Sequence, residues 1–311
     1  MKLAMLFPGQ GSQSVGMLRA YAGLPGVDHV RAEAARILGE AFVHLLDEGP
    51  EEQLDLTINT QPAMLVAGVA AYRAWQALGG PLPHLVAGHS LGEYSALVAA
   101  GSLAFADALP LVRFRAQCMQ EAVPEGQGAM AAILGLEDDA VRAACAESAD
   151  GEVVQAVNFN APGQVVIAGH RSAVARAIDA CKAKGARRAM PLPVSAPFHS
   201  SLMRPAAMRL HDYLANVAFA EPQIPVINNV DVAAETDPAR IRDALVRQAA
   251  SPVRWVETMR RLPEQGVSRV LECGPGRVLA ALARRIDGNL HGLALADRGS
   301  LEQALAALRG A

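Results

Sequence analysis

The chain has 311 residues, 51% of them hydrophobic, and a formal net charge of −3 at pH 7. This length and composition allow one large domain or two modest ones with a sizeable core. Charges of both signs are mixed along the sequence and aromatic residues make up only 4%, so the chain shows neither a nucleic-acid-binding face nor a polybasic helix for a membrane.

The four cysteines are far apart and lack C-x-x-C spacing, a pattern typical of reduced core residues in a cytosolic protein. No histidine stands at metal-ligand spacing, and we predict no metal site. The apolar run at the N-terminus is too short for a signal peptide, and no stretch reaches the about 18 apolar residues of a membrane span. These observations predict a cytoplasmic protein.

The first predicted strand, residues 3–7, leads into the loop Pro8-Gly9-Gln10-Gly11-Ser12-Gln13. The glycines let the backbone turn sharply, and in an open α/β sheet the loop would lie at the edge where ligands bind. Residues 27–77 are predicted to be mostly helical, with breaks at Gly49-Pro50 and near Thr60-Gln61-Pro62, after which residues 63–78 form one helix.

A strand, a tight turn and a helix are predicted over Leu85 to Gly101, and Ser90 stands at the turn in G-x-S-x-G spacing. This spacing lets a serine take a strained conformation while strand and helix approach each other, which exposes its hydroxyl. The first helical amides, beginning with Leu91, lack intrahelical partners and can face an oxyanion. The alternative is an ordinary strand-turn-helix connection with a buried serine.

The next predicted helix, residues 105–122, carries Arg115 at the border of its apolar stripe. Two interpretations stay open for this side chain. It extends to solvent, as most such arginines do, or its planar guanidinium binds a substrate carboxylate.

From residue 126 to about residue 194 the pattern becomes β-α-β-β-α-β, which is the order of a ferredoxin-like unit. We therefore predict a small domain, residues 126–196, inserted into a large domain formed by residues 1–125 and 197–311. Strands near residues 224–228, 267–273 and 293–296 alternate with helices, including one that starts at Ser300, and predict a mostly parallel sheet with helices on both faces. His199 lies in the loop where the chain returns to the large domain, so it can face Ser90.

Several motifs stand together in one order: FPGQGSQ, TQPA, GHSLGEYSAL, R-x-x-x-M-Q, NFNAPGQVVIAG, APFHS, SPVRW and GPG. As a set they resemble the malonyl-CoA:acyl carrier protein transacylases of fatty-acid synthesis and the acyltransferase domains of polyketide synthases, over nearly the whole chain. The resemblance implies an α/β-hydrolase-like large domain with an inserted ferredoxin-like domain. A chain of this length with no fused carrier segment favours the fatty-acid enzyme.

The resemblance also implies roles for individual residues. Ser90 would be the acylated nucleophile and His199 its base, oriented by the main-chain carbonyl of Gln248. The amides of Gln10 and Leu91 would form the oxyanion hole, and Arg115 would bind the malonyl carboxylate. The same motifs place four further residues at the substrate: Gln61, Met119, Asn160 and Phe198, the last with a ring that excludes methyl-branched groups. Ala116 departs from the family pattern, where we expect glycine.

The expected reaction moves a malonyl group from malonyl-CoA, through a malonyl-serine ester, to the phosphopantetheine thiol of acyl carrier protein, without a permanent cofactor. We expect a monomer. Acyl carrier protein is acidic, so a basic rim near the cleft is expected, with these candidates: Lys182, Lys184, Arg187, Arg188 and Arg204.

Two other classes of function remain open. In a lipase or esterase the chain order is serine, acid, histidine, so His291 with Asp287 or Asp212 would replace His199. Alternatively, the chain is a non-catalytic subunit that docks carrier proteins. A covalent malonyl adduct on Ser90 would exclude the second class.

Overall fold

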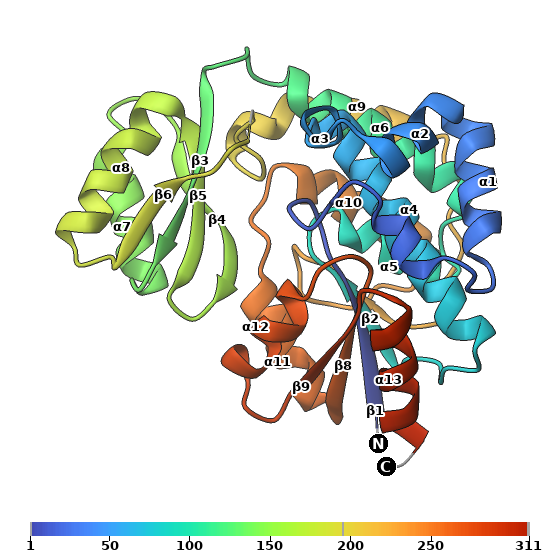
Figure 1. The fold of residues 1–311 in the computed structure, drawn as a ribbon. Helices are drawn as coiled ribbons and strands as arrows, with labels where there is room; N and C mark the ends of the chain where they lie inside the picture. The colour runs from blue at the N-terminus through green and yellow to red at the C-terminus, as the bar shows by residue number, and fades with distance from the viewer. Residues whose placement is uncertain (1, 195, 310–311) are drawn as a thin grey trace.

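The computed structural model describes residues 2–194 and 196–309, and Ser195 lies outside the described residues. These residues form a large and a small sheet, which lie in two adjoining lobes (Figure 1). The large sheet has the strand order β7-β2-β1-β8-β9, and every pairing in it is parallel. Its strands are β1 (Lys2–Phe7), β2 (Leu85–Gly88), β7 (Val226–Ile227), β8 (Val267–Cys273) and β9 (His291–Leu295).

Strand β1 lies in the middle of this sheet and is covered on both faces. Met5 and Phe7 pack into one apolar cluster, whereas Ala4 and Leu6 pack into another, as the alternation of side chains along a strand requires. The first cluster includes residues of α1 (Val27–Leu38), α2 (Glu40–Glu48), α4 (Thr57–Ala77), α5 (Gly92–Ala99), α6 (Phe105–Glu121), α9 (Arg204–Leu214), α10 (Pro238–Ala249) and α13 (Arg298–Arg309). The second includes residues of α11 (Trp255–Glu264) and α12 (Val278–Ile286). Shorter helical segments are η1 (Met17–Tyr21), α3 (Glu51–Leu54) and η2 (Ser201–Met203).

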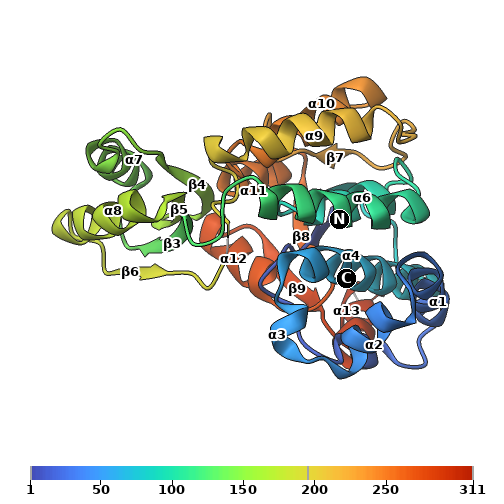
Figure 2. The ribbon, with the colours of Figure 1, turned by 90° about the horizontal axis from the view of Figure 1, so that it is seen from above.

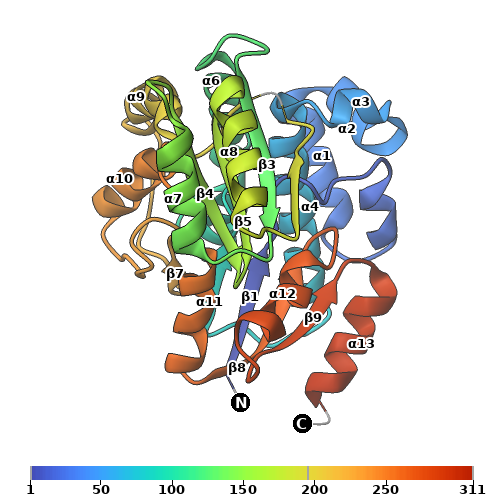
Figure 3. The same cartoon turned by 90° about the vertical axis from the view of Figure 1, so that its left-hand side faces the viewer.

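The small sheet is antiparallel, with the order β4-β5-β3-β6. It is built from β3 (Gly128–Leu134), α7 (Asp138–Ser148), β4 (Val154–Ala161), β5 (Gln164–His170), α8 (Arg171–Ala183) and β6 (Arg188–Pro191). Helices α7 and α8 cover its outer face (Figure 3). Its other face packs Met130 and Val166 against Met119 of α6 and Phe198. The predicted fold class, a mostly parallel α/β sheet with a ferredoxin-like insertion, is confirmed.

Seen from above, the small lobe lies beside the ends of α6, α9 and α12 (Figure 2). The loops that follow β1 and β2 lie on the side of the large sheet that is nearer to the small lobe (Figure 1). The arrangement brings the carboxyl ends of the central strands towards the small sheet, as expected for ligand binding in an open α/β fold.

Helices α4 and α13 begin earlier than predicted. Helix α4 begins at Thr57, and Pro62 lies inside it. Because this proline removes only one hydrogen bond of the helix and is buried, packing outweighs the loss. Helix α13 begins at Arg298, before the predicted Ser300. Asp297 Oδ1 accepts from the Ser300 amide at 2.7 Å, and the Asp297 amide donates to Ser300 Oγ at 3.0 Å, so the reciprocal cap forms three residues earlier than predicted.

Candidate active site

Ser90 stands at the turn between β2 and α5 with a φ of 52°. The two glycines of the motif allow this geometry because a side chain at either position would clash with neighbouring backbone. A Cβ atom on Gly88 would lie 1.8 Å from the carbonyl carbon of Gly92, and a Cβ on Gly92 would lie 2.0 Å from the oxygen of Phe7. The strained serine and the close approach of strand and helix are those of a nucleophile turn.

His199 also has a left-handed backbone, with a φ of 63° in the loop before α9. Its Nε2 lies 2.7 Å from Ser90 Oγ, and its Nδ1 lies 2.9 Å from the main-chain oxygen of Gln248. A carbonyl only accepts, so Nδ1 carries the proton and Nε2 accepts from the serine hydroxyl. Burial, with Arg115 as a nearby cation, lowers the pKa of His199 to about 3. The imidazole is therefore neutral at pH 7, as a general base must be.

Arg115 is buried, with 1% of its surface exposed, so its side chain does not extend to solvent. Its guanidinium donates to Gln61 Oε1 at 2.6 Å, and to Ser90 Oγ at 3.1 Å. It also donates to Gln248 Oε1 at 2.9 Å, and it lies 5.3 Å from the ring centroid of Tyr94. All three acceptors are uncharged oxygens, and burial lowers the pKa of this guanidinium. A buried cation held by neutral groups next to Ser90 is suited to bind an anionic ligand.

A cavity of about 130 Å³ contains these groups. Its lining includes most of the site residues that the sequence predicted, namely Gln10, Gln61, Ser90, Leu91, Arg115, Met119, Phe198 and His199. Leu91 precedes the first residue of α5, where amides lack intrahelical partners. Gln10 lies in the loop after β1, and its Oε1 accepts from Thr57 Oγ1 at 2.7 Å.

Asn160 lies outside this inner cavity. It lines an adjoining cavity of about 470 Å³, which shares Gln10, His89, Asn158, Leu192 and Val194 with the inner one. The Oδ1 atom of Asn160 pairs with His89 Nε2 at 2.8 Å. His89 is half-buried, and desolvation lowers its pKa. The structure therefore separates Asn160 from the residues grouped around Ser90.

Sequence reasoning missed two residues that hold the turn carrying Ser90. Asn229 Oδ1 accepts from the Ser90 amide at 2.7 Å, and Asn229 Nδ2 donates to the oxygen of Gly88 at 2.7 Å. Glu93, in the first turn of α5, accepts from the Asn229 amide at 2.9 Å. The signal for Asn229 is its position two residues after β7, at the same sheet edge as Ser90.

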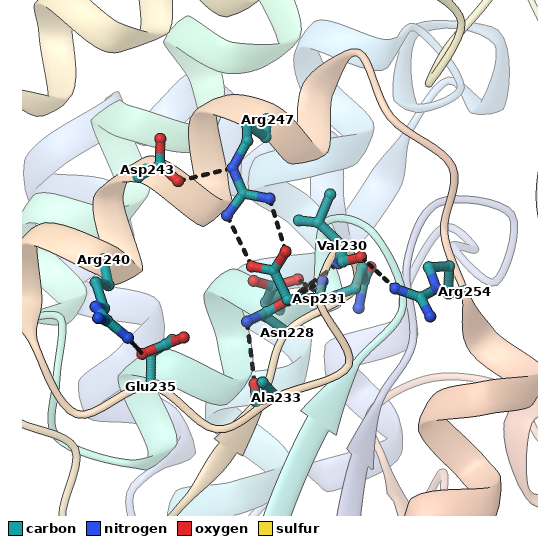
Figure 4. A network of polar contacts seen from close by, with 11 residues as sticks. Asn228, Val230, Asp231, Ala233, Glu235, Arg240, Asp243, Arg247 and Arg254 are labelled. Atoms are coloured by element: carbon teal, nitrogen blue, oxygen red, sulfur yellow. Dashed lines mark hydrogen bonds and ion pairs between the residues drawn. The ribbon is translucent and has the colours of Figure 1, made fainter.

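An ion pair joins the two segments that support the site. Asp231, in the loop after β7, accepts two hydrogen bonds from Arg247 of α10, at 2.8 and 2.7 Å (Figure 4). Arg247 also donates to Asp243 of its own helix at 2.7 Å. Gln248, whose carbonyl contacts His199, directly follows Arg247, and Asn229, whose side chain contacts the Ser90 amide, lies two residues before Asp231. The ion pair therefore connects the segment that holds His199 to the segment that holds Ser90.

The alternative triad of a lipase or esterase does not assemble. His291 is exposed at the start of β9, paired in register with Arg269 at the amino end of β8. Ser90 follows the carboxyl end of β2, and parallel strands put these ends at opposite edges of the sheet. Asp212 is exposed on α9, beside His211.

Part of the expected basic rim is already paired. Lys184 contacts Glu147 at 2.9 Å and Lys182 contacts Asp179 at 3.7 Å, all on the small lobe. Arg188 is exposed on β6, and Arg204 opens α9. In the described parts of the chain, no cluster of histidine, cysteine or acidic side chains is arranged to bind a metal, and no helix has the length and hydropathy to cross a membrane.

Residues 4–288 match the family model of the acyl transferase domain. The malonyl CoA-acyl carrier protein transacylase of Salmonella typhimurium is 55% identical over 305 residues, which cover 98% of this chain and 99% of that protein. The Bacillus subtilis protein of the same name is 43% identical over 310 residues, covering 99% and 98%.

Solved structures agree with these sequence matches. An acyl-carrier-protein S-malonyltransferase from Burkholderia pseudomallei superimposes with a TM-score of 0.96 at 60% identity, covering 98% of this chain and all of that one. A malonyl-transacylase solved in complex with a type II polyketide synthase acyl carrier protein has a TM-score of 0.97 at 53% identity, covering 99% and 100%. The chain therefore belongs to the acyl transferase family, among the malonyl CoA-acyl carrier protein transacylases, and the prediction of an acyltransferase is confirmed.

Proposed function

We propose that this chain transfers the malonyl group of malonyl-CoA to the phosphopantetheine thiol of acyl carrier protein by way of a malonyl ester on Ser90. The observation that carries the proposal is the 2.7 Å contact between Ser90 Oγ and His199 Nε2, beside a buried arginine. The names of the relatives and the complex of one of them with an acyl carrier protein support the substrates.

In the first half-reaction His199 Nε2 takes the hydroxyl proton as Ser90 Oγ attacks the thioester carbonyl carbon. The amides of Leu91 and Gln10 hold the oxyanion of the tetrahedral intermediate. The carbon–sulfur bond then breaks, and the proton on His199 goes to the sulfur of coenzyme A. In the second half-reaction the carrier thiol gives its proton to His199 and attacks the ester, and Ser90 recovers its proton. This chemistry needs no permanent cofactor or metal.

Arg115 supplies selectivity for an acyl group with a free carboxylate. Its guanidinium contacts Ser90 Oγ at 3.1 Å, so an acyl group on that oxygen would bring a carboxylate within reach of the same side chain. Gln61 holds Arg115 and its Nε2 lies 4.0 Å from Met119 Sδ. Phe198 is 9% exposed and lines the same cavity, where its ring limits the space for a branched group.

The outer cavity provides the route for the phosphopantetheine arm, with Asn160 and His89 on its wall. The charge of an acidic carrier protein favours a basic rim, for which Arg188 and Arg204 stay candidates.

We further propose that the large domain spans 1–125 and 197–311, the small domain spans 126–196, and the cleft between them is the site. We also propose a monomer with a cytoplasmic role in fatty-acid synthesis, for which the substrates argue.

A two-step transfer experiment tests this function. The enzyme is mixed with malonyl-CoA, freed of all coenzyme A species by gel filtration, and then mixed with carrier protein bearing its phosphopantetheine. The proposal expects malonyl-carrier protein to form in the second step. If malonyl transfer occurs only when malonyl-CoA and carrier protein are present together, the malonyl-serine route is wrong.

A further inference from the structure

Glu93 is a buried carboxylate to which the reaction described above gives no task. It lies in the first turn of α5 and is 2% exposed. Its Oε2 atom accepts from Gln248 Nε2 at 2.8 Å and from the Asn229 amide at 2.9 Å. Both donors belong to residues that hold the Ser90–His199 pair, so the position of this carboxylate bears on the reaction and not only on the fold.

The side-chain amide of Gln248 connects this carboxylate to the reacting groups. Its nitrogen donates to Glu93 Oε2 at 2.8 Å and to the main-chain oxygen of Ser90 at 3.1 Å. Its oxygen accepts from Arg115 at 2.9 Å. A flipped amide would put its NH₂ group against the guanidinium and its oxygen against the carboxylate, and both contacts would be repulsive. The anion on one side and the cation on the other thus fix one orientation.

We propose that Glu93 is a positioning residue of the transfer reaction, whose negative charge fixes the Gln248 amide and thereby the placement of Arg115 and Ser90. The proposal rests on the malonyl-serine route proposed above. Glu93 reaches Ser90 by a second path as well, through the Asn229 amide and the Asn229 side chain, which accepts from the Ser90 amide at 2.7 Å. It touches no reacting atom itself.

The charged surroundings of Glu93 come from several elements. Arg115 of α6 favours its charged form and Asp231, in the loop after β7, opposes it, while Glu235 lines a small cavity on the same side of α5 as Glu93. Asp231 is itself neutralised by Arg247. Burial outweighs the favourable contacts and raises the pKa of Glu93 to about 7. The carboxylate therefore changes its charge in a pH range where His199, with its pKa near 3, stays neutral.

The test compares wild type with Glu93→Gln, which keeps the shape and removes the charge. Rapid-quench measurement of malonyl-serine formation is expected to show a rate about tenfold lower in the variant at about pH 8, the loss that one charge-assisted hydrogen bond represents. The wild-type rate falls as pH decreases through about 7, and at about pH 5.5 it converges on the rate of the variant, which is flat across this range. A Glu93→Gln rate that equals the wild-type rate, or that retains the same pH dependence, overturns the proposal.

Gln248→Leu provides an independent arm, because it removes the side-chain amide and keeps the main-chain carbonyl that His199 contacts. It is expected to flatten the pH profile as well, and adding Glu93→Gln to it is expected to cost less than twofold more. Losses that multiply in the double variant overturn the proposal. If Glu93→Gln does not fold, the single variant Gln248→Leu decides, and a profile that keeps the wild-type pH dependence overturns the proposal. Ser95→Ala, on the same helix and also buried, is the control and should keep the wild-type rate and profile.

The same measurements separate this inference from the proposed function. A wild-type enzyme that forms no malonyl adduct on Ser90 refutes both. A wild type that forms the adduct, with both variants matching it in rate and pH dependence, refutes only the role of Glu93.

Discussion

Nδ1 of His199 donates to the main-chain oxygen of Gln248 over 2.9 Å. This carbonyl selects the tautomer in which Nε2 accepts from Ser90, the task that an aspartate performs in Ser-His-Asp sites. The anion is nevertheless close, because Glu93 contacts the side chain of the same glutamine at 2.8 Å. The imidazole of His199 thus contacts a neutral acceptor, and the carboxylate of Glu93 is connected to it only through Gln248.

Arg115→Ala should change which acyl group the enzyme prefers. The malonyl carboxylate loses its guanidinium partner, which lowers kcat/KM by the equivalent of about 2–4 kcal/mol, whereas an acetyl group has no carboxylate that the arginine could bind. The measurement is kcat/KM for malonyl-CoA and acetyl-CoA, with Arg113→Ala, half a turn away and exposed, as the control. Equal losses for both acyl groups would remove the carboxylate role.

His199→Ala and His291→Ala should behave differently. We expect the first to lose turnover by at least about a hundredfold, the scale of general-base catalysis, and the second to keep it, because His291 is exposed at the other edge of the sheet. Steady-state transfer to carrier protein measures both. Loss of turnover in His291→Ala alone would restore the triad order of a lipase.

Gly88→Ala should destabilise the protein, since its new methyl group would lie 1.8 Å from the carbonyl carbon of Gly92. Backbone on both sides of the contact cannot move aside, so we expect a loss of about 3 kcal/mol or more in the free energy of unfolding. Gly288→Ala is the matched control, because no atom lies within 4 Å of its added Cβ. Urea unfolding compares the two, and similar midpoints would show that the turn does not need the glycine.

Much of the site was predictable because its residues stand in local motifs. The glycines two positions before and after Ser90 predict the turn, because only glycine allows strand and helix to approach so closely. Gly88 and Gly92 do lie in such close contact. The repeated change between strand and helix patterns predicted both sheets, and the order β-α-β-β-α-β predicted the insertion.

What the sequence could not supply is long-range contact. Asn229 and Glu93 are 136 positions apart and meet only because β7 pairs with β2. Arg115 borders an apolar stripe, and its burial depends on acceptors from two other helices. The cap at Asp297 was missed because Asp and Ser are both preferred N-cap residues, and local pattern alone does not rank them.

The ion pair between Asp231 and Arg247 should matter more for rate than for stability. Both side chains are over a third exposed, so Arg247→Ala should lower the free energy of unfolding by no more than about 1 kcal/mol. Loosening the segments that carry Gln248 and Asn229 should lower the rate of malonyl-serine formation by about tenfold, because misplacement of reacting groups is costly. Asp243→Asn, which alters only the partner on the same helix, is the control, and an unchanged rate in Arg247→Ala would contradict this role.

The most direct test of the account is the intact mass of the enzyme after mixing with malonyl-CoA, followed by peptide mapping. We predict one malonyl group per chain, located on Ser90, absent in Ser90→Ala, and removed when carrier protein with its phosphopantetheine thiol is added. A wild-type enzyme that transfers malonyl groups without ever carrying one, or that carries it on another residue, would contradict the account.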